Sequence, residues 1–172
     1  MRLHPAPPIA VALLALAACS QRNNDETAGA PTPTPTLTTQ ALPTAAPDGT
    51  PLAMGEWLID ETATGASATF REQGGANALV LSCDRASHAL TLNRAGSATE
   101  PTRFRITIGA QAADVILAPA SDLGLVAQVD RAQPIFAAFA DPAAVIDISG
   151  PGVAPLRVPG HPGISRVLAA CA

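Results

Sequence analysis

Three neighbouring polar residues, Asp84, Ser87 and His88, carry the side chains that a hydrolase uses for nucleophilic attack. In such a triad the serine hydroxyl is the nucleophile, the histidine removes its proton and the carboxylate orients the histidine. No serine of the chain stands in a Gly-x-Ser-x-Gly pattern, which would present the hydroxyl on a sharp turn. A histidine at the start of a strand is more typical of a solvated or turn-capping residue, so a hydrolase is our third hypothesis.

The histidines, cysteines and aspartates of the chain do not have the spacing of a metal site. No His-x-x-x-His or Cys-x-x-Cys pair occurs, and the aspartates are too scattered for a calcium-binding loop. The residues considered as ligands are His88, His161, Asp122, Asp130 and Asp141. We therefore predict no metal and no cofactor.

The chain is mildly acidic, with a formal net charge of −4, and all of its basic residues are arginines. This charge argues against a nucleic-acid partner. Arg71, Arg103 and Arg105 could form a basic stripe that binds peptidoglycan carboxylates or lipopolysaccharide phosphates, but a solvated strand face explains them better. The aromatic residues are one tryptophan and four phenylalanines, too few for a stacking platform for sugars or bases.

Residues 1–18 have the composition of a secretory signal peptide. Arg2 supplies a positive charge, and residues 9–18 form an apolar segment that ends in small residues. Ten residues would span roughly 15 Å as a helix, about half of a bilayer core, which is too short for a transmembrane helix. We expect this segment to be removed from the mature protein.

The end of this segment, Leu16-Ala17-Ala18-Cys19, resembles the lipobox of bacterial lipoproteins, in which a leucine and small residues precede a cysteine. The resemblance implies a diacylglyceryl thioether on Cys19, cleavage before Cys19, and a fatty acid such as palmitate on the new N-terminus. Two or more acyl chains hold a protein stably on a membrane. Ser20 follows, where some inner-membrane lipoproteins carry aspartate, so we expect the outer membrane, facing the periplasm. The alternative is an ordinary signal peptide with Cys19 unmodified.

If Cys19 carries lipid, Cys83 and Cys171 are the cysteines that remain. The compartment beyond the inner membrane is oxidising, which favours disulfides. We therefore predict a Cys83–Cys171 disulfide that joins a strand to the C-terminal helix. The alternative is one buried thiol and one thiol at a frayed chain end.

Residues 19–51 have the composition of a disordered tether between lipid and domain. The repeat Pro31-Thr32-Pro33-Thr34-Pro35-Thr36 lacks backbone donors at every second position and favours polyproline II structure. At about 3.1 Å per residue, some thirty extended residues would reach on the order of 90 Å. We expect a spacer that holds the domain away from the membrane, and the alternative is a low-complexity insert without a role.

Residues 52–172 are long enough for a single folded domain with its own core. Short alternating runs are separated by glycine, aspartate and asparagine, a pattern typical of antiparallel strands. We predict an α+β, mainly β domain, a small antiparallel sandwich or barrel with two short helices. The predicted strands are 55–60, 67–72, 78–83, 88–93, 103–108, 113–117, 124–128 and 145–149, and the predicted helices lie near 134–140 and 162–171.

For the clearest strand and for the first helix, the sequence pattern predicts which side is buried and which faces water. In 103–108 the apolar residues alternate with arginine and threonine, so one side should be buried and the other should face water. Before the helix, Asp130 and Gln133 have the spacing of a reciprocal N-terminal cap. Phe136 and Phe139 lie three positions apart and should share one helix face.

The order of several motifs in residues 55–172 resembles that of uncharacterised small lipoproteins of Gram-negative bacteria. The motifs are Trp57, a strand ending in Cys83, Asp141-Pro142, Pro155-Leu156-Arg157-Val158-Pro159, and Ile164-Ser165-Arg166-Val167-Leu168 before Cys171. This resemblance implies no assigned activity.

The leading functional hypothesis is a lipid-anchored binding or structural module without enzymatic activity. It would recognise another envelope protein or the cell wall, by a sheet edge or a loop end. The first alternative is an inhibitor of a lysozyme or a protease, because a tethered, disulfide-linked β domain suits that task. The last alternative is the hydrolase that would use Ser87, His88 and Asp84.

Overall fold

The structure is a computed structural model that describes residues 44–172, so the predicted signal peptide, Cys19 and most of the predicted tether lie outside the described residues. The described chain forms nine antiparallel strands and two short helices, which confirms the mainly β class. The elements are β1 Gly55–Glu61, β2 Gly65–Glu72, β3 Asn77–Asp84, β4 Ala89–Arg94, β5 Thr102–Ile108, β6 Gln111–Ala120, β7 Gly124–Val129, α1 Pro134–Ala138, β8 Val145–Gly150, β9 Val153–Pro159 and α2 Ile164–Ala170.

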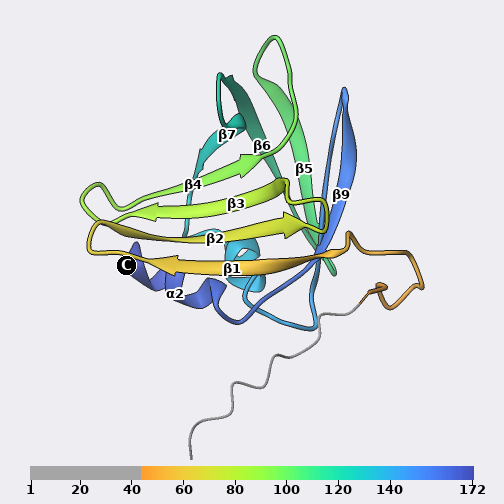
Figure 1. Ribbon diagram of the computed structural model, residues 1–172, viewed down its shortest axis with the longest axis horizontal. Coiled ribbons are helices and arrows are strands. Elements are labelled where there is room, and N and C mark those ends of the chain that lie inside the picture. The colour runs from red at the N-terminus through yellow and green to blue at the C-terminus, as the bar shows by residue number, and fades with distance from the viewer. Residues whose placement is uncertain (1–43) are drawn as a thin grey trace, which may run out of the picture. The chain divides into compact units, whose positions relative to one another are not determined.

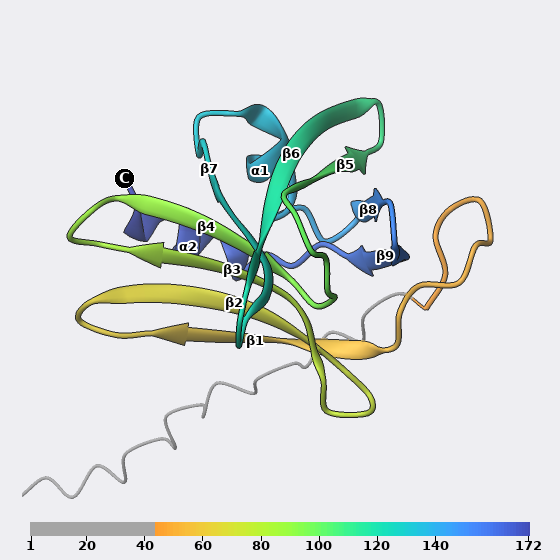
Figure 2. The ribbon, with the colours of Figure 1, turned by 90° about the horizontal axis from the view of Figure 1, so that it is seen from above.

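The strands form one sheet in the order β1-β2-β3-β4-β7-β6-β5-β8-β9, which curls into a half-barrel (Figures 1 and 2). The long strand β6 makes the turn between the two parts of the sheet. Its residues 111–117 pair with β5, and its residues 118–120 pair with β7. A ten-residue strand can therefore belong to both walls of the half-barrel.

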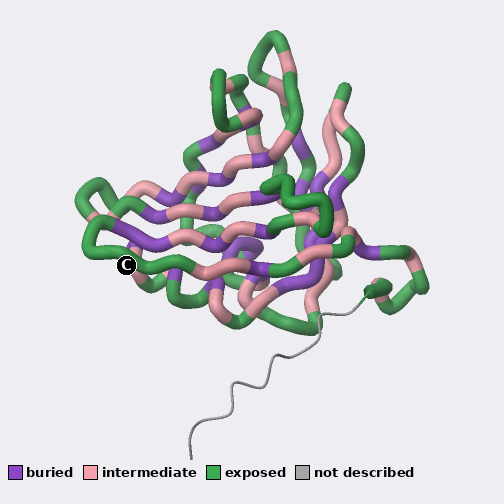
Figure 3. Tube along the Cα trace, in the orientation of Figure 1, coloured by how far each residue is buried: buried purple, intermediate pink, exposed green. Residues whose placement is uncertain are grey.

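The core lies on the inner side of this curl. Successive side chains of a strand point to opposite sides, and Figure 3 shows buried positions alternating with partly exposed ones along β2, β3 and β4. Phe70, Leu81 and Leu92 from these strands are fully buried. Helix α1 packs on β5 and β6, and α2 packs on β2 and β3, so that both helices cover the inner side.

The structure contains all eight predicted strands, and it adds β9, which the sequence analysis missed. Pro155 and Pro159 concealed this strand, because proline lacks the backbone donor of a sheet ladder. β9 is the last strand of the sheet and pairs only with β8. A proline is tolerated on an edge strand, since one side of that strand needs no ladder partner.

For the first helix, the structure confirms the predicted buried face and contradicts the predicted N-terminal cap. Phe136 and Phe139 are both fully buried, with ring centroids 5.7 Å apart. The reciprocal cap is wrong, because the N-cap residue is Gln133 and it makes no side-chain cap bond. Pro134 occupies the first helical turn and holds Gln133 in an extended conformation, so the helix begins after Gln133. The Asp130 carboxylate instead accepts the backbone N–H of Ala132 in a separate turn.

Residues 44–51, assigned to the tether from the sequence, form a small ordered hairpin. Ala45 and Pro51 make an isolated bridge, and the Leu52 N–H donates to the Thr44 carbonyl at 3.0 Å. The Asp48 carboxylate accepts the Thr50 N–H at 3.0 Å, and Gly49 has a φ of 77°, which favours glycine at this turn. Thr44 is therefore the start of the described folded chain.

Arg94 is a buried charged residue on the inner side of β4, at 7% exposure. Its guanidinium donates to the carbonyl oxygens of Ala95 at 2.7 Å and Ala154 at 3.0 Å, and it lies 3.3 Å from that of Ala78. Burial lowers the pKa of Arg94, and nearby Glu72 partly opposes that shift. These carbonyl contacts connect β4 to β3 and β9 across the half-barrel.

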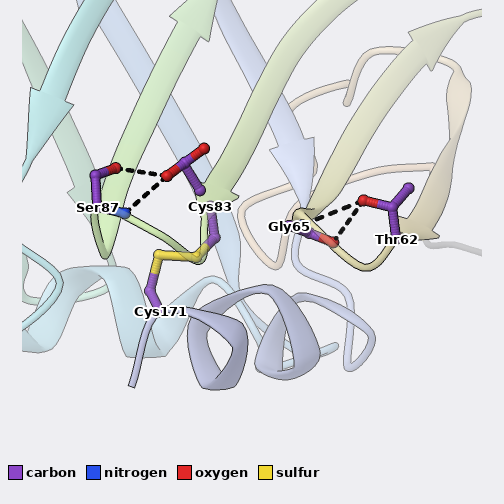
Figure 4. The surroundings of a disulfide bond; sticks show 6 residues. Thr62, Gly65, Cys83, Ser87 and Cys171 are labelled. Carbon is purple, nitrogen blue, oxygen red and sulfur yellow. Dashed lines mark hydrogen bonds between the residues drawn. A yellow bond between two sulfur atoms is a disulfide. The ribbon is translucent and has the colours of Figure 1, made fainter.

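The predicted disulfide joins Cys83 at the end of β3 to Cys171, which directly follows α2 (Figure 4). Both cysteines are buried. α2 has no side-chain cap, no acidic residue in its first turn and no basic residue in its last turn. A seven-residue helix of this kind is marginal by itself, so its position depends on the disulfide and on apolar side chains such as Ile164 and Val167.

Replacing Phe136 by alanine should lower the free energy of unfolding by about 3–5 kcal/mol, because it removes a fully buried ring. Leu123→Ala is the control, since Leu123 is 62% exposed and its truncation should change stability by about 0.5 kcal/mol at most. Chemical denaturation followed by circular dichroism measures both. Equal losses in the two variants would contradict the assignment of the core.

The variant with both Cys83→Ser and Cys171→Ser should lose about 4–5 kcal/mol of stability, the chain-entropy value for a crosslink over 88 positions. Denaturation of the wild-type protein with and without a dithiol reductant measures the same difference. The reductant should have no effect on the double variant. A wild-type protein that does not respond to full reduction would contradict this role of the disulfide.

Candidate functional site

Asp84, Ser87 and His88 occupy the turn between β3 and β4, and they are arranged as a turn rather than as a triad. The Asp84 carboxylate accepts the Ser87 hydroxyl at 2.7 Å and the Ser87 backbone N–H at 2.8 Å (Figure 4). These two bonds, the hydroxyl first, lower the pKa of Asp84. His88 is exposed, has a φ of 54° and makes no hydrogen bond with any residue of 44–172.

This geometry lacks the contact between base and nucleophile on which a triad depends. The serine hydroxyl is held by the carboxylate, and the histidine ring is turned to solvent. Asp84 therefore acts as the cap of a hairpin turn, and the arrangement gives the hydrolase hypothesis no support.

The residues considered as metal ligands are dispersed in the structure. Asp130 and Asp141 each accept a backbone N–H two residues later, as turn-forming aspartates do. Asp122 lies in the β6–β7 turn, and His161 precedes α2. Within residues 44–172, no three histidine, cysteine or acidic side chains gather in a way that would hold a metal ion.

The three arginines of the possible basic stripe do not come together as one surface. Arg103 and Arg105 lie on β5, and both contact the carboxylate of Asp114 on β6, at 3.4 Å and 3.3 Å. Arg71 lies on β2, which four strands separate from β5 in the sheet. The pair on β5 is partly neutralised by Asp114 and is a solvated strand face.

The outer side of the neighbouring strands β1–β4 and β7 forms one continuous surface, which we call the outward face. Its side chains form two rows at paired register positions, and most of them are half-buried by their neighbours. Both helices lie on the opposite side of these strands, and Figure 1 views the outward face directly. The first row is Asp60, Ser67, Ser82, Thr91 and Gln128, and the second row is Leu58, Thr69, Val80, Asn93 and Val126.

The two rows consist mainly of small hydroxyl and amide groups with three aliphatic side chains, and the charged residues Glu56 and Arg71 lie beside them on the same side of β1 and β2. Hydroxyls and amides both donate and accept hydrogen bonds. The ionised group of the two rows is Asp60. Such a mixture of polar and apolar groups resembles the surface of a non-obligate protein interface more than that of a catalytic cleft.

One end of the outward face is hollowed, where the β1–β2 and β3–β4 hairpins turn. The hollow has a volume of about 260 Å³. Arg85 braces its rim, because its guanidinium donates to the Thr62 and Ala63 carbonyls and its backbone N–H donates to the Thr64 carbonyl at 3.0 Å. The polar residues that line the hollow are Asp60, Thr62, Thr64, Ser67, Ser82, Asp84 and Thr91.

Sequence reasoning did not find the outward face. The alternation of side chains along a strand places residues such as Ser82 and Thr91 on the side away from the core. Their alignment into rows depends on which strands pair and in what register, and β4 pairs with β7 after skipping β5 and β6. No local pattern specifies that pairing.

None of the helices in residues 44–172 combines the length and the apolar character that crossing a bilayer requires. The lipobox, the signal peptide and Cys19 lie outside the described residues and remain predictions. No family model, curated protein or solved structure matches this chain.

Proposed function

We propose that this protein is a lipid-anchored envelope protein, held in the outer membrane through Cys19 and facing the periplasm. Its domain binds another envelope protein through the outward face and performs no catalysis. The lipobox resemblance supports the anchor. The outward face supports the binding role, and it is the single observation on which that role rests.

The outward face is broad enough for a protein partner. It spans five neighbouring strands, or roughly 20 Å at the usual strand spacing. Asp60 and Gln128 are exposed at the ends of one row, while the residues between them are half-buried. A surface of mostly short side chains loses little conformational entropy when it is covered, which favours its use for docking.

The region between lipid and domain is consistent with such docking. Residues 20–43 precede the ordered hairpin that begins at Thr44. Twenty-four residues in polyproline II structure would extend roughly 75 Å. A domain on an arm of that reach can meet a partner some distance from the membrane.

Binding at the outward face is better supported than inhibition of a lysozyme or a protease. An inhibitor needs a projecting loop with side chains that fill an enzyme cleft. The β8–β9 hairpin stands clear of the front strands in Figure 1, and its tip, Pro151-Gly152, consists of small residues, as does the β5–β6 turn of Gly109 and Ala110. Such tips offer little contact surface to a cleft.

Cys19→Ser should release the protein from the membrane, because the hydroxyl cannot form the lipid thioether. Detergent phase partitioning of the full chain, expressed in a Gram-negative host, measures the result. The wild-type protein should enter the detergent phase and the variant the aqueous phase. A variant that still enters the detergent phase would refute the lipid anchor without bearing on the outward face.

A photoreactive side chain at Thr69 or at Thr91 should form the same discrete protein adduct in intact cells, because both residues lie on the outward face. The matched control is Ala112, which is exposed on β6 outside that face. Ser82→Arg should reduce the adduct at least about tenfold by placing a charged, bulky side chain in the centre of the face. Ala112→Arg should leave the adduct unchanged.

Three results of this experiment would contradict binding at the outward face. They are a failure to form an adduct at both positions, an equally strong adduct from Ala112, and an adduct that survives Ser82→Arg. Folding of the arginine variants is checked by circular dichroism, so that a loss of the adduct reflects the surface and not the core.

A further inference from the structure

The imidazole of His161 holds the N-cap residue of helix α2 rather than the N–H groups of its first turn, and we call this contact the His161 cap. The N-cap residue is Gly163, which has no side chain to offer, and the first turn contains no acidic residue. The Nδ1 atom of His161 instead accepts the Gly163 backbone N–H at 3.1 Å. The backbone of His161 also contributes, because its carbonyl accepts the Ile164 N–H at 3.0 Å.

The same residue connects α2 to two other elements. The His161 N–H donates to the Phe139 carbonyl at the end of α1, at 3.0 Å. Gly163 lies directly against Ile59 of β1, so closely that a Cβ atom at this position would come within 2.7 Å of the Ile59 side chain. The first turn of α2 is therefore packed tightly at a junction with α1 and β1, and His161 is half-buried there.

The cap requires the neutral form of the imidazole. A neutral ring has one nitrogen that accepts a hydrogen bond, whereas both nitrogens of the protonated ring are donors. Protonation would therefore break the bond to Gly163. It would also place a positive charge at the positive end of the helix dipole.

Among the charged side chains on the elements around His161, Arg166 disfavours protonation of the imidazole. Arg166 lies on the next turn of α2 and forms an ion pair with Glu61 of β1, at 3.1 Å. Asp141 follows α1, and its carboxylate accepts the Ala143 N–H. Within residues 44–172, His161 has no carboxylate ion-pair partner. Burial, and then the charge of Arg166, lower the pKa of His161.

We propose that His161 is a pH-sensitive cap, whose protonation in mild acid releases the first turn of α2 from β1. The disulfide holds the other end of the helix at β3. Acid therefore loosens the first turn of α2 from the core and leaves the last turn attached through the disulfide. The released form regains its docked position when the ring loses the proton.

The direction of this pH dependence follows from the two states of the ring. In the docked helix the pKa of His161 lies below its ordinary value of 6.5, and release returns the ring to water. The released state therefore binds the proton more readily. Docking is fully stabilised above about pH 6.5, and it weakens as the pH falls through the lowered pKa.

Trp57 is a built-in reporter of this junction, and it is the sole tryptophan of the chain. Its indole Nε1 donates to the Pro159 carbonyl at 2.8 Å, two residues before His161. The ring is buried and contacts Phe70 edge to face, with centroids 5.4 Å apart. Movement of the segment before α2 should therefore change the fluorescence of Trp57.

The test is the emission of Trp57 in the full-length protein in detergent, between pH 7.5 and pH 5.5. The wild-type emission should shift to longer wavelength as the pH falls. His161→Asn should abolish this shift, because the asparagine oxygen can accept the Gly163 N–H and does not titrate. His88→Asn is the matched control, since His88 is exposed in the β3–β4 turn, and it should retain the wild-type shift.

An unchanged shift in His161→Asn, a loss of the shift in His88→Asn, or no shift in the wild-type protein would overturn the proposal. A second measurement, on the wild-type protein alone, tests the proposal even if a variant fails to fold. In the wild-type protein, the imidazole proton resonances of His161 should titrate with a midpoint below 6.5. A midpoint at or above that value would also overturn it.

Discussion

The curl of the sheet depends on a tie between its two end strands. Near the start of β1, the Ala53 N–H donates to the Arg157 carbonyl of β9 at 2.8 Å, and the indole of Trp57 donates to the Pro159 carbonyl. An open sheet of nine strands would expose its apolar side to water. With its ends tied, the sheet wraps around its own apolar side, and two short helices suffice to cover the remainder.

This closure also separates the two sides of the front strands into different chemical surfaces. The inner side is apolar and covered, and it contains the charge of Arg94, whose terminal nitrogens donate to backbone carbonyls while its buried Nε has no partner among the described residues. The outer side has short polar groups whose positions are set by the pairing register. The proposed binding role of the outer side and the structural role of the inner side therefore both depend on the same alternation along each strand.

Much of the fold was predictable, because its signals are local. The alternation in residues 103–108 identified β5 and its buried side, and the spacing of Phe136 and Phe139 identified the buried face of α1. The disulfide followed from the number of cysteines and the expected compartment. β9 was missed because its prolines argue against a strand, and only its position at the sheet edge makes them acceptable. The capping spacing of Asp130 and Gln133 was misleading because Pro134 determines where the helix begins.

The candidate site was much less predictable. The proximity of Asp84, Ser87 and His88 in sequence suggested chemistry, but a tight turn brings such residues together without aligning them. The outward face was not visible in the sequence, because its rows combine residues from strands that are distant along the chain. The cap at His161 was similarly hidden, because its importance arises from the contact of α2 with α1 and β1.

The position of α2 in the chain has a consequence for the way the protein reaches its folded state. The helix is the last element in sequence, yet it covers the inner sides of β2 and β3, which come early. A chain that crosses a membrane with its N-terminus first must therefore expose those apolar surfaces until α2 has emerged. On the export route proposed above, the early strands need protection from aggregation during that interval, and folding follows export.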